Sequence, residues 1–389
     1  MVAVSAQACR YCDESGVEVV LDLGAQPACD DFPPADDPRT EALFPLRMGM
    51  CVACGLAQLL EDDTAPEEPR GVEPAALVRQ AEQAVYRAAA AGFLPLNGRF
   101  AEYGSPHGGS WAGLLANRGL TEVSPGEQAD LVLDCFGLMH EADQFAALSK
   151  RIDGLAEGGT LLIQFHSLAS VLRDGEWNAL RHGHYAYYST PTLVNMVERL
   201  GLVARRAWTF DLYGGTVLLA CSREGRQSDG VTALIREERA FGVLDVAQVS
   251  RLQSAMERGA LELWSWLEQA TGSGLRVVGY GAASRAVPLL CAAGIGPELL
   301  SAVVDAAEPK QGRRLPGAGI PIVGPEALRT LQPDLVLLFV PDLLTEVRAA
   351  YPEVEEAGGH WVRADRIGLE ARVPAARDAT TSVLQMRES

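Results

Sequence analysis

Residues Arg99–Leu120, with the sequence RFAEYGSPHGGSWAGLLANRGL, decide the fold class. Apolar residues, a run of glycines and a helical pattern predict a strand at Arg99–Tyr103, a turn at Gly104–Gly109 and a helix at Trp111–Arg118. Glycines in such a turn let a ligand approach the backbone, and the helix N-terminus favours an anionic group. The alternative is that these glycines serve turn geometry alone. The residues that we expect at a cofactor site are Glu102, Gly104, Ser105, His107 and Gly108.

The same alternation of short apolar runs and helical patterns continues towards the C-terminus. The further strands predicted in this way are Asp130–Cys135, Thr160–Phe165, Leu275–Tyr280, Ser301–Asp305 and Asp334–Val340. Apolar runs of this length, bounded by glycine and proline, suit parallel strands that are covered on both faces. We therefore predict an α/β protein with two successive doubly wound layers.

Composition and charge narrow the possible function. The chain has 389 residues, with 33 Lys and Arg against 51 Asp and Glu, and a formal net charge of −18. This charge argues against nucleic acid or an anionic membrane as a partner, because both require a basic patch. The sequence has neither an apolar run of the ~18 residues that cross a membrane nor a signal-peptide pattern, so we expect a cytoplasmic protein. Cysteines in that compartment indicate metal ligands or buried thiols rather than disulfides.

Two cysteine pairs, Cys9 with Cys12 and Cys51 with Cys54, have the spacing of zinc knuckles. Each pair can place two thiolates on one edge of a turn, and two such turns complete a tetrahedron around Zn²⁺. Four thiolates leave no open position on the metal, so this zinc is expected to be structural. The alternative is two unrelated pairs of buried thiols.

These features predict three domains. An N-terminal zinc-knuckle module covers residues 1–60, a central Rossmann domain covers residues 75–226, and a C-terminal Rossmann-like domain covers residues 231–389. The acidic, proline-rich segment 61–74 is predicted to be a linker or an irregular loop.

The segment Arg181–Ser189, RHGHYAYYS, follows a predicted strand, and α/β enzymes place their active sites at such ends. A histidine can act as a general base, an arginine can hold an oxyanion, and tyrosines can donate hydrogen bonds or pack against a sugar ring. The alternative is a surface loop whose aromatic residues only pack. The candidate catalytic residues are His184, Arg181, Tyr185, Tyr187 and, from the end of the preceding strand, His166.

The segment Gly279–Arg285, GYGAASR, imitates a dinucleotide fingerprint, with an acidic residue about twenty positions later that can meet a ribose. A cationic, glycine-rich loop follows at residues 308–317 and suits a ligand that carries phosphate. The alternative is a solvated loop. The candidate substrate-binding residues are Gly281, Ser284, Arg285, Asp305, Lys310 and Arg313.

Taken in order, these motifs resemble the deoxysugar C-methyltransferases of actinobacterial antibiotic pathways. The resemblance also rests on Cys54–Leu59 (CGLAQL), Tyr187–Ser189 and Tyr213–Gly215. It implies a structural zinc, a central domain for S-adenosylmethionine, and a C-terminal domain that helps to hold a nucleotide-linked 4-keto sugar. It also implies that His184 removes the proton next to the ketone before methyl transfer.

The chain departs from the family pattern in several places. Arg181 and Gly183 replace a tyrosine and a glutamate, and the first glycine loop reads Gly-Ser-Pro-His-Gly instead of Gly-Ser-Asn-Asp-Gly. The acidic linker replaces a segment that supplies a further tyrosine. Residues 118–125 run almost directly into the strand at Asp130, where family members have another helix and strand on the adenine side of the cofactor. These departures leave two alternatives: a diverged enzyme of acid–base chemistry that needs no S-adenosylmethionine (epimerisation, elimination or cyclisation), or a non-catalytic partner protein.

Overall fold

The computed structural model describes residues 7–64 and 73–367. Contacts within the chain divide it into two compact units: Met1–Asp31 with Arg39–Glu257, and Phe32–Pro38 with Arg258–Ser389. The first unit therefore contains both the cysteine pairs and the central sheet. The second unit takes in seven residues from the N-terminal region. Residues 65–72 of the predicted linker lie outside the described residues.

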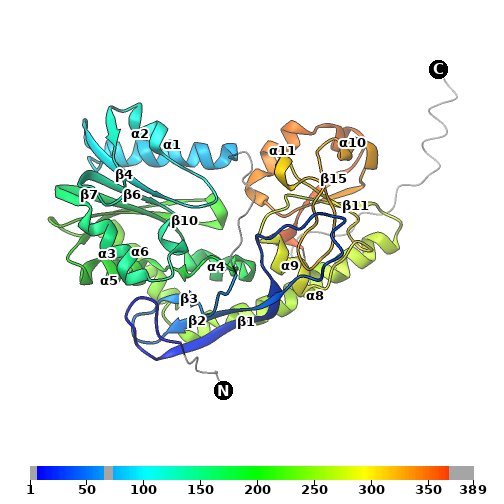
Figure 1. Cartoon of the computed structure of the whole chain (residues 1–389), viewed down its shortest axis with the longest axis horizontal. Coiled ribbons are helices and arrows are strands. Elements are labelled where there is room, and N and C mark those ends of the chain that lie inside the picture. The colour runs from blue at the N-terminus through cyan, green and yellow to red at the C-terminus, as the bar shows by residue number, and fades with distance from the viewer. Residues whose placement is uncertain (1–6, 65–72, 368–389) are drawn as a thin grey trace. The chain divides into compact units, whose positions relative to one another are not determined.

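The central sheet has six strands in the order β5-β4-β6-β7-β10-β9 (Figure 1). β4 to β7 are parallel, and β10 runs antiparallel to both of its neighbours. The strands are β4 (Gly98–Gly104), β5 (Leu120–Glu122), β6 (Ala129–Cys135), β7 (Leu155–His166), β9 (Val203–Phe210) and β10 (Thr216–Ser222). This sheet confirms the predicted α/β class and the predicted strands that follow Arg99, Asp130 and Thr160.

Helices cover both faces of the central sheet (Figure 1). On one face, apolar residues of α1 (Ala75–Ala90) and α2 (Ala112–Ala116) pack with Leu131, Leu133 and Leu218 of the strands. On the other face, α3 (Gln144–Asp153), α5 (Thr190–Arg199) and α6 (Asp229–Phe241) pack with residues such as Val132 and Ile163. Because alternate residues of each strand point to opposite faces, both sides of the sheet become core.

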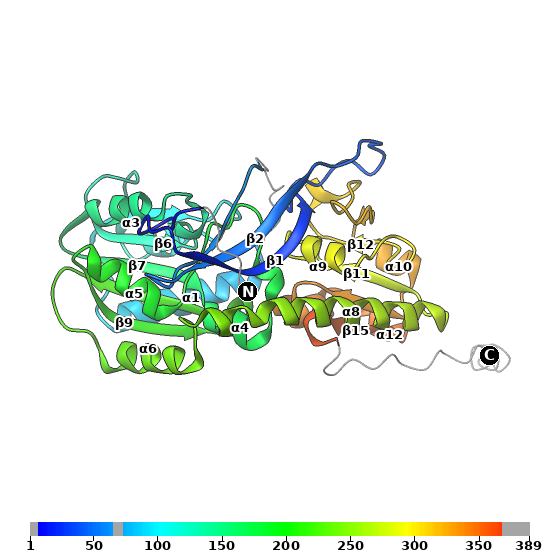
Figure 2. The same cartoon turned by 90° about the horizontal axis from the view of Figure 1, so that it is seen from below.

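At one edge the sheet ends at the short strand β5. Residues 123–128 lead from β5 to β6 without an intervening helix or strand, which confirms the direct connection expected from the sequence. The first unit also contains a four-stranded antiparallel sheet of β1 (Val17–Pro27), β2 (Leu43–Cys51), β3 (Ala57–Leu59) and β8 (Ala186–Tyr187). β1 and β2 form a long twisted ribbon (Figure 2). β8 comes from the segment that holds His184, so this sheet ties that segment to the cysteine module.

The second unit is built on five parallel strands in the order β13-β12-β11-β14-β15. They are β11 (Val277–Tyr280), β12 (Val303–Val304), β13 (Ile322–Val323), β14 (Leu335–Leu338) and β15 (His360–Arg363). The helices of the second unit are α9 (Ala286–Ala292), α10 (Ala327–Leu331), α11 (Leu344–Ala350) and α12 (Glu353–Glu356). The first unit has two further short helices, α4 (Leu168–Asp174) and α7 (Val246–Val249). The long helix α8 (Arg251–Gly272) contributes residues to both units. No helix among the described residues is long and apolar enough to cross a membrane.

Candidate functional site

The glycine loop begins where β4 ends at Gly104. Gly108 and Gly109 have φ angles of +104° and +89°, which residues with a side chain rarely adopt. A Cβ built on Gly104 or on Gly108 would meet no atom within 4 Å. Packing within the protein therefore does not require glycine at Gly104, and the open space beside the loop leaves its backbone accessible to a ligand.

Glu102 of β4 is engaged by the protein itself. One carboxylate oxygen accepts a hydrogen bond from the backbone N–H of Trp111 at 2.7 Å, and the other accepts one from the Ser110 hydroxyl at 2.5 Å. Glu102 therefore fixes the start of α2, which is a positioning role beneath the loop.

His140 is a residue of this site that the sequence patterns did not single out. It ends a short 3-10 helix, Leu138–His140, that follows β6. Its Nδ1 donates a hydrogen bond to the carbonyl oxygen of Gly183 at 2.9 Å, because a carbonyl can only accept. The position of this residue just after the end of a parallel strand was the signal that could have found it.

The structure brings His107, His140 and His184 together. The ring centroids of His140 and His184 are 4.5 Å apart, and His107 lies 5.0 Å from His140 and 5.6 Å from His184. His107 is exposed, His140 is partly buried and His184 is buried. We call these three side chains the histidine cluster.

Two members of the histidine cluster, His140 and His184, are held in the neutral form. Burial, with His107 nearby, lowers the pKa of His140 to about 3. Burial also lowers the pKa of His184 well below its usual value, and the positive charge of Arg181 adds to the effect. The Nε2 atom of His184 is buried and has no hydrogen-bond partner in the described structure. A lone buried ring nitrogen of this kind is costly unless a ligand or a proton transfer uses it.

A buried polar network fixes the segment beneath His140. Asp134, at the end of β6, accepts hydrogen bonds from the backbone N–H of Leu138 at 3.0 Å and from Arg151 Nε at 2.5 Å. The side chains of Asp134 and Arg151 are 0% and 1% exposed, so water does not compete for this pair. Gln144 donates to the carbonyl oxygen of Leu138 at 2.9 Å. Because this buried network holds Leu138, it fixes the backbone that leads to His140.

The predicted catalytic residues Tyr187, Tyr185 and His166 contact other parts of the protein. The Tyr187 hydroxyl accepts a hydrogen bond from the backbone N–H of Arg181 and donates one to Ala179, and burial raises its pKa. Tyr185 lies under the Arg10 guanidinium, 4.7 Å from its ring centroid. His166 Nε2 lies 3.5 Å from a Glu176 carboxylate oxygen. Tyr187 and Tyr185 therefore brace the loop within the protein.

The loop that carries His184 is also tied to the cysteine module and to the segment that follows it. The backbone N–H of Gly183 donates to Asp62 Oδ2 at 2.6 Å, and Gly183 has a φ of +78°. Leu59 N–H donates to the carbonyl oxygen of Tyr185 at 3.1 Å. A change in the structure of the module should therefore displace the loop that carries His184.

The four predicted zinc ligands converge. Cys9 Sγ lies 3.5 Å from Cys54 Sγ, and Cys12 Sγ lies 3.6 Å from Cys51 Sγ. A tetrahedral zinc with Zn–S bonds of about 2.3 Å places its sulfurs about 3.8 Å apart, so the four thiols fit this metal. Gly55, with a φ of +77°, supplies the left-handed turn after the last cysteine.

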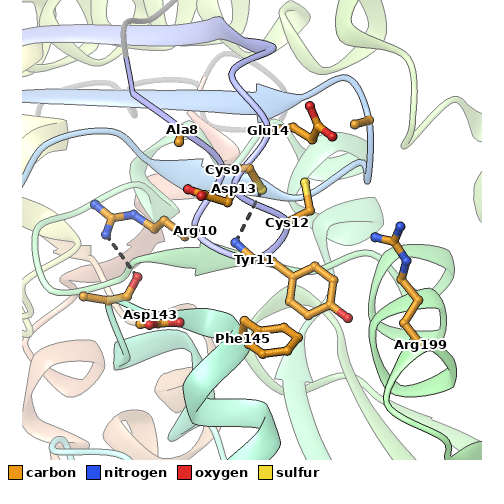
Figure 3. A pocket seen from close by; sticks show the side chains of 12 residues that line it. Ala8, Cys9, Arg10, Tyr11, Cys12, Asp13, Glu14, Asp143, Phe145 and Arg199 are labelled. Carbon is orange, nitrogen blue, oxygen red and sulfur yellow. Dashed lines mark hydrogen bonds between the residues drawn. The ribbon is translucent and has the colours of Figure 1, made fainter.

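A pocket of about 920 Å³ opens beside the first cysteine pair. Figure 3 shows Tyr11 and Phe145 side by side at this pocket, with ring centroids 5.9 Å apart. Its lining includes Cys9 and Cys12 but none of the predicted catalytic residues. This pocket and the histidine cluster are therefore separate features of the first unit.

In the second unit, three of the six predicted substrate-binding residues make side-chain hydrogen bonds within the chain itself: Asp305, Lys310 and Arg313. Asp305 Oδ2 accepts from the backbone N–H of Ala282 at 2.6 Å, in the turn after β11 that contains Gly281. Lys310 Nζ donates to the carbonyl oxygen of Ala282 at 2.8 Å and lies 4.7 Å from the Phe32 ring centroid. Lys310 and Asp305 thus clamp the glycine turn from both sides.

Arg313 has a similar structural role. Its guanidinium donates to the carbonyl oxygens of Phe32 at 2.6 Å and Pro309 at 2.8 Å, which fastens segment Phe32–Pro38 to this unit. Ser284 is buried, whereas Arg285 is partly exposed at the start of α9. Part of the Arg285 side chain is therefore accessible from solvent.

Comparison with known proteins supplies the family context. Residues 211–364 match the family model of the C-methyltransferase C-terminal domain, and residues 9–68 match the family model of a zinc binding domain. The chain is 24% identical to C-methyltransferase NovU of Streptomyces niveus, over 91% of this chain and 94% of that protein.

Similar solved structures are methyltransferases that align with a smaller part of the chain. Magnesium protoporphyrin IX methyltransferase from Synechocystis PCC 6803 with bound SAH is 11% identical and has a TM-score of 0.30; the match covers 38% of this chain and 84% of that one. A SAM-dependent methyltransferase from Thermotoga maritima is 17% identical and has a TM-score of 0.26; the match covers 38% of this chain and 96% of that one.

Proposed function

We propose that this chain methylates a carbon next to a ketone, on a nucleotide-linked deoxysugar or a related natural product. The proposal is supported by the match of residues 211–364 to the C-methyltransferase C-terminal domain, the match of residues 9–68 to a zinc binding domain, and the 24% identity to a C-methyltransferase. In this proposal His184 is the base that removes the proton from that carbon. The observation that carries it is the buried Nε2 atom of His184, which has no hydrogen-bond partner in the described structure and lies beside the glycine loop.

The environment of His184 supports a role as base. Only a neutral imidazole can accept a proton, and burial keeps this ring neutral at physiological pH. When the proton leaves carbon, negative charge moves to the ketone oxygen. Arg181, whose charge acts on the His184 ring, is the residue that we assign to stabilise this oxygen. Positioned base catalysis of this kind contributes about 10²–10⁴-fold.

S-Adenosylmethionine is the cofactor that this function requires, and it would supply the methyl group. The open space beside Gly104 and Gly108 fits the approach of such a ligand to the backbone. We assign Gly104, Ser105 and Gly108 to hold it, and Glu102 to keep the loop in place through Trp111. The carboxyl ends of parallel strands are where α/β folds bind cofactors.

The other two parts of the chain have supporting roles in this proposal. The zinc held by Cys9, Cys12, Cys51 and Cys54 is structural, since four thiolates leave no position for substrate. In the second unit, Arg285 at the start of α9 is assigned to the phosphate groups of the nucleotide. Asp305, Lys310 and Arg313 keep the adjoining turn and loop in place.

A second candidate function is favoured by the edge of the central sheet. β5 has three residues, and residues 123–128 lead straight to β6, so no further helix and strand extend the cofactor side. Several hydrogen bonds lost there, at about 0.5–1.5 kcal/mol each, would reduce cofactor affinity by orders of magnitude. The chain would then perform enolisation chemistry alone, such as epimerisation or elimination.

Calorimetric titration with S-adenosylmethionine separates the two candidates. Micromolar binding, together with a methylated product from a nucleotide-linked 4-keto deoxysugar, is expected from the first. Binding weaker than millimolar in a folded, zinc-loaded chain would overturn the methyltransferase proposal and leave cofactor-independent enolisation.

A further inference from the structure

Three imidazoles from three separate segments meet at the ends of β4 and β6. His107 comes from the glycine loop, His140 from the turn after β6, and His184 from the loop before β8. Each ring can offer one nitrogen such that the three nitrogens all lie within 4.8 Å of one another. Residues far apart in the sequence therefore bring three potential ligand atoms close together.

Two of the three rings are already oriented as metal ligands. His140 donates its Nδ1 hydrogen to the carbonyl oxygen of Gly183, 2.9 Å away, so its Nε2 carries the lone pair. The Ser105 hydroxyl lies 3.3 Å from this Nε2 atom, and a metal ion there would replace that contact. A second ring nitrogen bound to a backbone carbonyl is the arrangement that fixes histidine ligands in metal sites. His184 has its Nε2 buried and without a hydrogen-bond partner in the described structure. The third ring, His107, is exposed.

The chemistry of the donors selects the kind of ion. Neutral imidazole nitrogens suit zinc, cobalt, nickel and copper, whereas magnesium and calcium require oxygen ligands. A tetrahedral ion with metal–nitrogen bonds of about 2.0–2.1 Å holds its ligand nitrogens about 3.3 Å apart. The three nitrogens lie within 4.8 Å of one another, so the side chains would move closer together on binding. Three protein ligands leave one coordination position open.

We propose that His107, His140 and His184 form a second metal site, distinct from the four cysteines, which binds one divalent transition-metal ion and leaves one position for water or a substrate oxygen. The site does not depend on the proposed function. It does bear on it, because the lone pair of His184 Nε2 cannot hold a metal and accept a proton at the same time. Metal bound at the histidine cluster should therefore inhibit proton removal by His184.

The test is a titration of the zinc-loaded, full-length chain with Co²⁺. Cobalt held by three histidines gives visible ligand-field bands without the thiolate charge-transfer band that cobalt would show if it replaced zinc at the cysteines. We expect one cobalt per chain with the first type of spectrum and with zinc content unchanged. No cobalt binding, or binding only with the thiolate band, would overturn the proposal.

Single substitutions locate the site. His107→Ala changes an exposed side chain and should fold normally, so it is the decisive variant. His107→Ala and His140→Ala should each weaken cobalt binding by at least about 10–100-fold. That is the loss seen when a residue that only hydrogen-bonds to a metal ligand is removed, and a ligand itself should matter more. The matched control is His360→Ala, which removes an exposed histidine from the second unit and should leave binding unchanged. Retention of full cobalt affinity in His107→Ala would contradict the assignment.

Failure of this inference and failure of the proposed function are distinguishable. Cobalt binding is read by its spectrum in the absence of any substrate, whereas methyl transfer is read without added cobalt. If the chain binds cobalt but does not methylate, the metal-site proposal stands and the methyltransferase proposal fails. If the chain methylates but binds no cobalt, the metal-site proposal fails and the proposed function stands.

Discussion

The Nδ1 atom of His140 donates a hydrogen bond to the carbonyl oxygen of Gly183, 2.9 Å away. This bond joins the turn after β6 to the loop that carries His184. On the other side, the N–H of the same Gly183 donates to Asp62 Oδ2 at 2.6 Å. One peptide segment is thus held between the central sheet and the segment that follows the cysteine module, and the position of His184 depends on both.

Gly183→Ala tests whether this backbone geometry matters. The φ of +78° is unfavourable for alanine, which should cost about 1–2 kcal/mol of unfolding free energy and displace the loop. We expect methyl transfer to fall by at least tenfold. Gly201→Ala is the matched control, because Gly201 has a φ of +82° and, like Gly183, open space around its Cβ position. If both variants lost stability and activity equally, the loop would have no special role.

Asp62→Ala should loosen the same loop from the opposite side. Removing the acceptor of the Gly183 N–H leaves a partly buried donor without its protein partner, which costs about 1–3 kcal/mol. We expect lower kcat with zinc content unchanged, measured by steady-state kinetics and metal analysis. The neighbouring exposed residue provides the control: Asp63→Ala should behave as the wild type. Loss of zinc in Asp62→Ala would show instead that the aspartate supports the module.

Zinc removal should destabilise the first unit. One zinc per chain is expected in the freshly purified protein, and Cys51→Ser should lose it and unfold at a lower temperature. Cys291→Ser, which alters a thiol of the second unit, should keep both zinc and stability. Metal analysis with thermal unfolding gives both values, and a zinc-free wild type with normal stability would refute the four-thiolate site.

Arg285→Ala should weaken binding of the nucleotide-linked sugar without loss of stability. In the proposed function Arg285 contacts a phosphate group of the substrate. Such a contact is charge-assisted, and the Arg285 side chain is partly exposed, so we expect about a tenfold increase in Kd by calorimetry. Arg348→Ala, which removes an exposed cation paired with Glu355, is the control. Unchanged affinity in Arg285→Ala would remove this residue from the substrate site.

The local features could be predicted from the sequence, because they depend on neighbouring residues. The strand and turn around Gly104 follow from the alternation of apolar residues and glycines. The cysteine pairs follow from their spacing. The direct passage from β5 to β6 follows from the short segment between Leu120 and Asp130.

The interactions that could not be predicted join distant segments. His140 enters the site only because β6 lies beside β4 in the parallel sheet, a register that no local pattern specifies. Lys310 and Arg313 were expected to bind phosphate, yet both contact Phe32, which lies far away in the sequence and packs with the second unit. Glu102 was likewise expected at the cofactor site, yet its carboxylate accepts a hydrogen bond from the backbone N–H of Trp111. The sequence of a motif does not show which distant residue a charged side chain will contact in the folded protein.

The most direct test of the central claim is deuterium exchange at the carbon next to the ketone. The chain, free of metal at the histidine cluster, is incubated in D₂O with a nucleotide-linked 4-keto deoxysugar, and exchange is followed by NMR. We predict exchange by the wild type and by Gly201→Ala, and a loss of about 10²-fold or more in a folded His184→Ala variant. Equal exchange in the wild type and His184→Ala would contradict the account.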